Sequence, residues 1–427
     1  MPDVANLEAV WCTHGVVSFR GNAEPIDALS AMLALDHPLK KAAEAWAAAN
    51  LGPVCDSTFD RARWQAAADA GVLGLMMPEQ FGGTPCPAVN TMLIFEGLGR
   101  GASDNGLVFA LASQVIAMQR ALLAFGSDAQ LQRHLPALVR GEAVGAFALT
   151  EAAAGSDTGA VTTLAQEQPD GSYVLTGEKA WTTLAPVCDV VILFATSNPE
   201  QGRWGLSAFV VDTRTPGVVL GPPVAKMGLA GCPVGAIELN SVHVGADAVL
   251  GRPGAGGAVF APAVDAERAF LYAGQLGATE RVLDLAIERA RTRMASGRNI
   301  GSFQAVSHRI VDLKLRHEAA RLLLYKAAAL YDRGESVAQA AALTKIQAAE
   351  QGVEAALDAM RVFGADGYGV DAGVEMELRD ALGGLFYSGT TDVARNIVAG
   401  SLRLDRARAS SKSAPSKPRD IERQPPA

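Results

Sequence analysis

The sequence has few cysteines, no long apolar run and no excess of positive charge. Its five cysteines are scattered over 427 residues, and none has the spacing of a metal or redox motif. We therefore expect reduced thiols, a cytoplasmic protein and no metal site. The apolar stretch 106–118 is interrupted by Ser113 and Gln114 and is shorter than the ~18 residues that span a bilayer. The N-terminus lacks the basic-then-apolar order of a secretory signal.

The formal net charge of -8 argues against nucleic acid or an anionic membrane as the main partner. Apolar residues make up 49% of the chain and charged residues 19%, which is an ordinary globular balance. The length permits two or three domains with a large core.

Changes in sequence pattern divide the chain into five predicted segments. These are an N-terminal extension (1–37), a helical domain (38–143), a β domain (144–260), a helical bundle (261–405) and a disordered basic tail (406–427). The predicted fold class is α+β, mostly α. Short β-branched runs without intervening helices predict an antiparallel sheet in the β domain. Four long helical segments with short links predict a four-helix bundle, at about 264–296, 303–332, 336–363 and 391–403.

A turn near the end of the chain begins a helix. Residues 385–397 read LFYSGTTDVARNI, in which Gly389 tolerates left-handed backbone angles and Thr390 or Thr391 suits the N-cap. Asp392 suits the positive end of the helix dipole. The free N–H groups of such a turn can bind a carboxylate, a phosphate or an oxyanion. Read alone, the segment is more often an ordinary capped helix.

A small, polar segment, FALTEAAAGSD at 147–157, begins the β domain. Small residues let a flat ligand approach the backbone, and Thr150 and Ser156 can form hydrogen bonds. Read alone, it is more often a structural loop. With KAWTT at 179–183, however, it resembles the acyl-CoA dehydrogenase family, which reads A-x-TE-x-x-x-GSD followed by K-x-W-I-T-N.

Further segments resemble the same family in the expected order, over residues 38–404 in all. They are KMGLAG at 226–231, FQAVSH at 303–308, RVFGADGY at 361–368 with RDA at 379–381, and YSGTTDVAR at 387–395. The family counterparts are KMG-x-RG, FQ-x-V-x-H, Q-x-x-GG-x-G-Y with RDA, and Y-E-G-T-x-E-x-x-R. Each match alone is weak, whereas the combination is specific.

The resemblance implies FAD bound between the β domain and the bundle of a homodimer or homotetramer. By position, the flavin end would be lined by Phe147, Leu149, Thr150, Ser156, Trp181 and Thr183, with Trp181 against the isoalloxazine. The adenosine-diphosphate half would be reached across the dimer by Arg293 and Gln304, with Gly364 and Ala365 near the pyrophosphate. Thr390 and Asp392 would lie near the ribityl and adenosine parts.

Three departures make the adenine end match the family less closely than the flavin end. The aromatic residue that packs on adenine is replaced by Ser296. The usual glutamine before Phe363 is Arg361, and the second glycine of the usual pair is Ala365.

The catalytic base of this family is a carboxylate that removes the α proton of an acyl thioester, while the β hydrogen passes as hydride to flavin N5. Most members carry this glutamate in Y-E-G-T, where this chain has Ser388. A serine hydroxyl without an activating partner is far too weak a base. Isovaleryl-type and long-chain-type members instead place a glutamate directly before an arginine on the first bundle helix. That position is occupied by Glu267, followed by Arg268, so we predict Glu267 as the base.

The surroundings of Glu267 in the sequence are apolar, and Ala273, Gly274 and Gly277 are expected to leave room for a ligand. Burial there would raise the pKa of Glu267. Read alone, Glu267 would more often suit a helix start or pair with an arginine. The backbone N–H of Ser388 is expected to bind the thioester oxyanion, and Arg268 and Gly389 to contact the substrate.

The function implied is FAD-dependent α,β-dehydrogenation of an acyl thioester carried by coenzyme A or by an acyl-carrier protein. Electron-transfer flavoprotein is the acceptor that the family implies. A flavin monooxygenase or oxidase on the same fold is the second enzyme class. The third possibility is a catalytically silent scaffold. It is the least favoured, because the Thr150–Trp181 set is intact and Glu267 is present.

Overall fold

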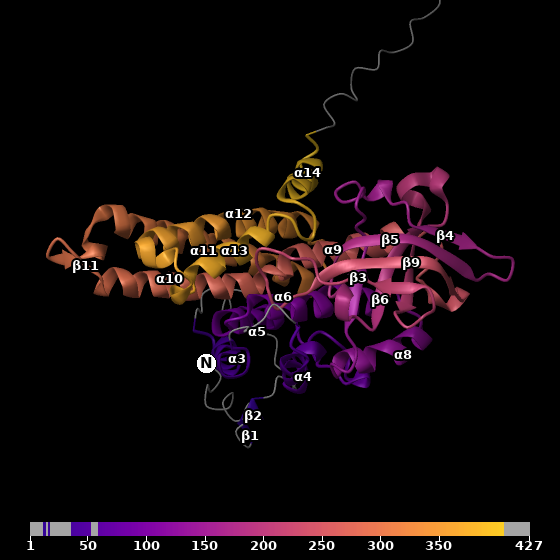
Figure 1. Ribbon diagram of the computed structural model, residues 1–427, viewed down its shortest axis with the longest axis horizontal. Helices are drawn as coiled ribbons and strands as arrows, with labels where there is room; N and C mark the ends of the chain where they lie inside the picture. Colours follow the sequence, from indigo (N-terminus) through magenta and orange to yellow (C-terminus); the bar gives the residue numbers. More distant parts are fainter. Residues whose placement is uncertain (1–11, 14–15, 18–35, 53–58, 405–427) are drawn as a thin grey trace, which may run out of the picture.

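The structure is a computed structural model that describes residues 12–13, 16–17, 36–52 and 59–404. The chain runs through a group of helices, one sheet and a second group of helices, with the sheet at one end of an elongated molecule (Figure 1). The predicted fold class is therefore confirmed. Most of the predicted extension and all of the predicted tail lie outside the described residues. Within the extension, the backbone pairs β1 (Cys12–Thr13) with β2 (Val16–Val17).

Four of the N-terminal helices, α3, α4, α6 and α8, begin at a residue whose side chain accepts a hydrogen bond from the first turn. Asp60 accepts hydrogen bonds from the N–H groups of Ala62 and Arg63 at the start of α4. The last helix, α8, begins with a capping box between Ser127 and Gln130. The helices are α3 (Pro38–Asn50), α4 (Arg61–Asp69), α5 (Ala88–Gly101), α6 (Asn105–Ser113), the π-helical turn η3 (Gln114–Gln119), α7 (Arg120–Phe125) and α8 (Asp128–Val139).

One helical stretch, Asn105–Phe125, is long and apolar enough to cross a membrane, with a mean hydropathy of 1.6. It is longer than the apolar run apparent in the sequence because the helix continues through η3 into α7. In this molecule 72% of the most apolar 18 residues of this helical stretch is buried. The core helices of globular proteins pass the same test, so the stretch is weak evidence for a membrane span.

The sheet of the β domain has the strand order β10-β7-β6-β4-β5-β9-β8, with β3 paired to β6. Most neighbours are antiparallel, as predicted, but β3 and β4 both pair with β6 in parallel. The sheet is therefore mixed, since the long connection from β3 to β6 returns the chain in the same direction. The strands are β3 (Gly145–Ala148), β4 (Leu164–Glu167), β5 (Tyr173–Thr183), β6 (Val190–Thr196), β7 (Leu206–Asp212), β8 (Val218–Leu220), β9 (Val234–Val244) and β10 (Val249–Leu250).

The C-terminal bundle is built around α12, which packs against each of the other long helices. The helix predicted at 264–296 begins earlier, at Gly256, and is interrupted at Leu271. The sequence analysis missed α13, because the segment is short and follows a glycine-rich break. The helices are α9 (Gly256–Phe270), α10 (Tyr272–Thr292), α11 (Gln304–Asp332), α12 (Ala338–Phe363), α13 (Val374–Gly383) and α14 (Thr391–Ser401).

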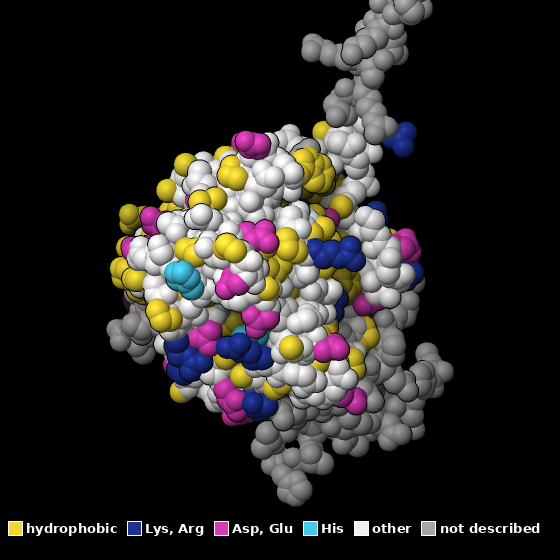
Figure 2. Space-filling model, turned by 90° about the vertical axis from the view of Figure 1, so that its right-hand side faces the viewer, with side chains coloured by type: hydrophobic (Ala, Val, Ile, Leu, Met, Phe, Trp, Pro, Cys, Tyr) yellow, Lys and Arg dark blue, Asp and Glu magenta, His cyan; other side chains and the backbone are white. Residues whose placement is uncertain are grey.

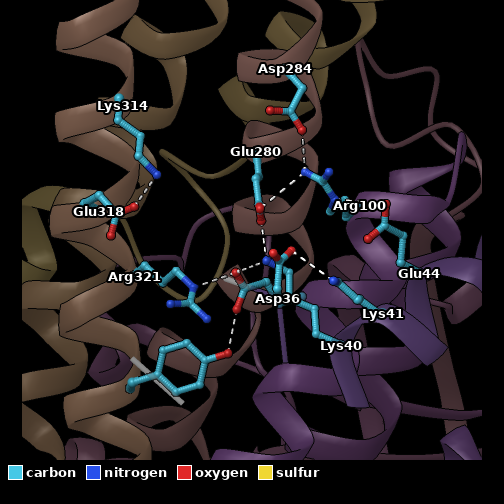
Figure 3. A network of polar contacts seen from close by, with 12 residues as sticks. Asp36, Lys40, Lys41, Glu44, Arg100, Glu280, Asp284, Lys314, Glu318 and Arg321 are labelled. Atoms are coloured by element: carbon cyan, nitrogen blue, oxygen red, sulfur yellow. Dashed lines mark hydrogen bonds and ion pairs between the residues drawn. The ribbon is translucent and has the colours of Figure 1, made fainter. Parts of the chain in front are cut away.

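A buried network of charges joins the N-terminal helices to the bundle (Figure 3). Glu96 of α5 accepts hydrogen bonds from Lys40 at 3.0 Å, Arg321 at 2.7 Å and the Tyr325 hydroxyl at 2.5 Å. Lys40 also pairs with Glu280 of α10. Burial raises the pKa of Glu96, but the charges of Arg321 and Lys40 outweigh it and hold the pKa below its usual value.

The face over the β domain carries acidic and basic side chains interspersed with apolar ones (Figure 2). No broad surface of one sign is visible on the described part of this face.

We predict that Glu96→Gln lowers the free energy of unfolding by about 3–5 kcal/mol, because it leaves Lys40 and Arg321 buried with less negative charge. Chemical denaturation followed by circular dichroism measures the change. Glu318→Gln is the control, since the Lys314–Glu318 pair lies on the surface of α11 and should contribute less than ~0.5 kcal/mol. Equal effects of the two substitutions would contradict the importance of the buried network.

Candidate active site

The two segments that resemble the flavin-binding motifs lie side by side at the start of the β domain. The N–H of Ala180 donates to the carbonyl oxygen of Thr150 at 2.8 Å, and Lys179 Nζ donates to that of Leu149 at 3.2 Å. The structure thus brings together residues that are about thirty positions apart in the sequence.

The buried side chains of Glu151 and Lys179 hold these two segments together. The Glu151 carboxylate accepts from Lys179 Nζ at 2.7 Å and from the N–H and hydroxyl groups of Thr162 and Thr163. Burial raises the pKa of Glu151, but these hydrogen bonds outweigh it and lower the pKa to about 2. Both side chains are almost fully buried, so they hold the loop and do not face a ligand.

Trp181 is the most exposed aromatic residue of this group, with 64% of its surface accessible. It lies at a shift in register between β5 and β9 and has a φ of 53°. Such bulges redirect a side chain out of the regular pleat. Nearby, Phe147 packs against Phe194 and Phe260 and supports the sheet below the loop. An exposed flat aromatic ring offers a surface on which the flat ring system of a flavin can pack.

The predicted base and the turn 385–397 meet directly. Ser388 Oγ donates a hydrogen bond to Glu267 Oε1 at 2.6 Å, although the two residues are 121 positions apart. Ser388 has a φ of 54° and Gly389 a φ of 82°, so two successive residues adopt left-handed angles. That conformation is costly for serine and persists where the surroundings impose it. The turn therefore aims Ser388 at the end of α9.

The carboxyl group of Glu267 has a raised pKa. Burial is the main cause, and it outweighs the hydrogen bond from Ser388 and the charges of Arg268 and Lys345, all of which lower the pKa. Arg268, predicted to contact the substrate, pairs with Asp265 at 2.6 Å within the same helix. The sequence analysis missed Lys345, a single lysine in an alanine-rich segment of α12, whose isolation among apolar residues was the available signal.

The expectation of room for a ligand beside Glu267 is wrong at Gly277, whereas Gly274 lines a small cavity. A Cβ atom on Gly277 would lie 1.9 Å from the Glu96 carbonyl oxygen, and one on Gly99 would lie 1.9 Å from that of Gly274. The glycines instead let α10 and α5 pack backbone against backbone. Small residues on a helix serve close packing as readily as ligand binding.

Four of the predicted FAD-binding residues lie at the far end of the molecule. Arg293 and Gln304 flank the hairpin of β11 (Met294–Ala295) and β12 (Arg298–Asn299), and Gly364 and Ala365 follow α12. β11 lies at the opposite end of the elongated molecule from β5 (Figure 1). Within one chain these residues and Trp181 are therefore not brought together.

Thr390 and Asp392 lie at the start of α14, as predicted. The Thr390 hydroxyl accepts from the N–H of Val393 at 3.3 Å, which makes Thr390 the N-cap. The Asp392 side chain is 88% exposed and lies in the first helical turn. Ser156 is also exposed, in the loop that follows Thr150.

Models of three acyl-CoA dehydrogenase domains match almost the whole described chain. The N-terminal domain matches residues 36–142, the middle domain 146–242 and the C-terminal domain 254–402. The chain belongs to the acyl-CoA dehydrogenase family.

Relatives include enzymes that act on carrier-bound substrates. An L-prolyl-[peptidyl-carrier protein] dehydrogenase of Pseudomonas fluorescens is 38% identical over 81% of this chain and 91% of the relative. An acyl-CoA dehydrogenase of Bacillus subtilis is 35% identical over 77% and 86%. Among solved structures, the prolyl acyl carrier protein oxidase AnaB is 35% identical, with a TM-score of 0.83 over 85% of this chain and 97% of AnaB. PigA with FAD and proline is 34% identical, with a TM-score of 0.83 over 86% and 97%.

The enzyme is thus an FAD-dependent dehydrogenase of acyl thioesters, an oxidoreductase of this family. Bound FAD supplies the acceptor for a hydride. Trp181, with an exposed ring beside the backbone of Thr150, is free to contact a bound flavin, and the roles of Trp181, Thr150 and Thr183 at the flavin end remain predictions. The positions of Arg293, Gln304, Gly364 and Ala365 remain predictions for the adenosine-diphosphate half.

We predict that Ser388→Ala shifts the acidic limb of the kcat–pH profile, where protonation of the base lowers kcat, to a pH about one unit higher. The substitution removes a hydrogen bond that favours the carboxylate, so the raised pKa of Glu267 rises further, and the base is lost to protonation at a higher pH. The dependence of kcat on pH measures the shift. Ser388→Gly is the matched variant, because it also lacks the hydroxyl but relieves the left-handed backbone. An unchanged limb in both variants would contradict the role of the hydroxyl.

Proposed function

We propose that Glu267 is the base that removes the α proton of the acyl thioester. The observation that carries the proposal is the 2.6 Å contact between Glu267 Oε1 and Ser388 Oγ. Residue 388 is the position where most members of the family carry their base. A carboxylate that reaches residue 388 from α9 therefore occupies the region in which the proton must be removed.

The roles of the surrounding groups follow from their chemistry. The α proton passes to the Glu267 carboxylate, whose raised pKa brings it nearer to the working pH. Negative charge then develops on the thioester oxygen, and the backbone N–H of Ser388 is placed to donate to it. The β hydrogen leaves on the opposite face, where Trp181, Thr150 and Thr183 would hold the isoalloxazine.

We infer that the substrate is a small aminoacyl group, such as prolyl, attached to a carrier protein. Relatives in Pseudomonas fluorescens and Serratia at 38% and 36% identity are named for the prolyl-carrier reaction, and AnaB and PigA with proline support the same class.

We predict that prolyl-carrier thioester bleaches the flavin absorbance of the anaerobic wild-type enzyme, whereas long-chain acyl-CoA does not. Glu267→Gln should retain bound flavin and lose bleaching by at least about 10³-fold in rate, because an amide cannot accept the α proton. Stopped-flow absorbance with matched prolyl and acyl groups on both carriers measures these rates. Glu288→Gln, an exposed acid of α10, is the control and should bleach normally.

Bleaching of Glu267→Gln at the wild-type rate would overturn the assignment of the base. A faster reaction with acyl-CoA would overturn the choice of carrier. Electron-transfer flavoprotein is the acceptor that we propose, since a relative in Acetobacterium woodii, 32% identical over 78% of this chain, is named as a subunit of a caffeyl-CoA reductase–Etf complex. Stoichiometric peroxide in air would instead favour the oxidase reaction, for which AnaB is named.

We also infer that the enzyme is a homo-oligomer, a dimer or tetramer, that works in the cytoplasm. Val311, Leu315 and Leu322 of α11 are 62%, 65% and 49% exposed and follow helical spacing along one side of the bundle. A second copy packed there would cover them. It would also supply Arg293 and Gln304 to the distant flavin end, which one chain cannot do by itself.

We predict that Leu315→Glu dissociates the oligomer and lowers the flavin content, because it places a charge in an apolar contact. Light scattering coupled to gel filtration gives the mass, and absorbance gives the FAD per chain. Val219→Glu is the control, since Val219 is an exposed apolar residue of β8 in the other domain. A monomeric wild-type enzyme with full flavin content would refute the shared site.

A further inference from the structure

A fully buried lysine lies beneath the turn that carries Ser388. Lys345 of α12 has no accessible surface. Its Nζ donates to the Tyr387 carbonyl oxygen at 2.6 Å, the Gly384 carbonyl oxygen at 3.0 Å and the Tyr272 hydroxyl at 3.0 Å. Two of its three partners are therefore backbone groups of the segment that leads into the active-site turn.

The three acceptors match the three donors of a protonated ammonium group. The Tyr272 hydroxyl donates its own proton to Gly384 at 2.6 Å, so it can only accept from Lys345. Burial lowers the pKa of Lys345 to about 7, and the negative charge of Glu267 opposes this effect. The rings of Tyr272 and Tyr387, with centroids 5.4 and 5.2 Å from Nζ, give the cation further favourable contacts.

The bond to Tyr387 determines the direction of the next N–H. The carbonyl of Tyr387 and the N–H of Ser388 belong to one peptide unit, which is planar and trans. Because the carbonyl points at Lys345, the N–H points the opposite way. Among the described residues, that N–H donates to no acceptor. A hydrogen bond from a cation to the carbonyl also polarises the peptide and strengthens its N–H as a donor.

We propose that Lys345 is a positioning residue for the dehydrogenation, which orients and polarises the Tyr387–Ser388 peptide so that its N–H stabilises the thioester oxyanion. The inference rests on the proposed function, because it assumes a thioester carbonyl beside Ser388. Lys345 touches neither the substrate nor the reacting atoms. Its charge also favours the carboxylate form of Glu267, so one buried cation supports both the base and the oxyanion donor.

The test measures the acidity of a bound thioester that mimics the developing enolate. The probe is 3-oxobutanoyl-pantetheine, which carries the thioester end common to coenzyme A and carrier proteins. Its α proton is lost to an enolate with its own ultraviolet absorbance, so a pH titration on the FAD-loaded enzyme gives the pKa of the bound probe. Lys345→Met, of similar length without a donor, is compared with Tyr272→Phe, which keeps the bond from Lys345 to Tyr387.

The expected result is a rise of about one unit in the pKa of the probe bound to Lys345→Met, and a kcat about tenfold lower with little change in KM. That loss is smaller than the 10²–10³ typical of removing an oxyanion donor outright, because Lys345 acts through the peptide. Tyr272→Phe should stay within ~0.3 units of the wild type. Equal shifts in Lys345→Met and Tyr272→Phe, or no shift in either, would overturn the proposal.

Two further results keep the outcome decisive. If Lys345→Met does not fold with bound FAD, the test uses Lys345→Gln, which retains one amide donor. This variant should shift the pKa of the bound probe by an intermediate amount. A pKa equal to that of the wild type would overturn the proposal. If the wild-type enzyme forms no enolate with the probe, the proposed function itself fails. If the wild-type enzyme does form the enolate and Lys345→Met leaves the pKa of the probe unchanged, only the role of Lys345 is refuted.

Discussion

The hydrogen bond between Ser388 and Glu267 is the contact on which the active site depends. It joins the first bundle helix to the turn before α14, across 121 residues of sequence. A carboxylate at this position must be buried enough to be a useful base and close enough to the oxyanion donor to act on the same thioester. The serine hydroxyl gives the buried carboxylate a hydrogen-bond donor, and it offsets only part of the rise in the pKa of Glu267 that burial causes.

The geometry of that contact requires α9, α12 and the turn to hold fixed positions. Lys345 ties the turn to α12 through the carbonyls of Gly384 and Tyr387. The close approach of α5 to α10 at Gly277 fixes the next helix relative to the N-terminal domain. The network around Glu96 then joins the same helices by charge, in an interior where an unpaired charge would be costly. Packing and electrostatics thus act on the same interface.

Much of the fold could be predicted because its signals are local. Helix-forming segments, short β-branched runs and capping residues follow from propensity and periodicity, and the order of the three regions followed from them. The parallel pairing of β3 with β6 could not be predicted, because it depends on where a long connection returns. The role of Gly277 in α10 could not be predicted for a related reason. A small residue looks the same in sequence whether it faces a ligand or another helix.

The sequence by itself determined that residue 388 is a serine where most of the family carries its glutamate, and that a glutamate directly before an arginine lies at 267–268, the pair on which the proposed base rests. Only the tertiary structure decided that the Ser388 hydroxyl bonds to Glu267 and that Lys345 holds the peptide between them. The physical reason is that hydrogen bonds depend on distance and direction in space. Residues 267, 345 and 388 lie on separate elements, and no local pattern in the chain encodes their meeting.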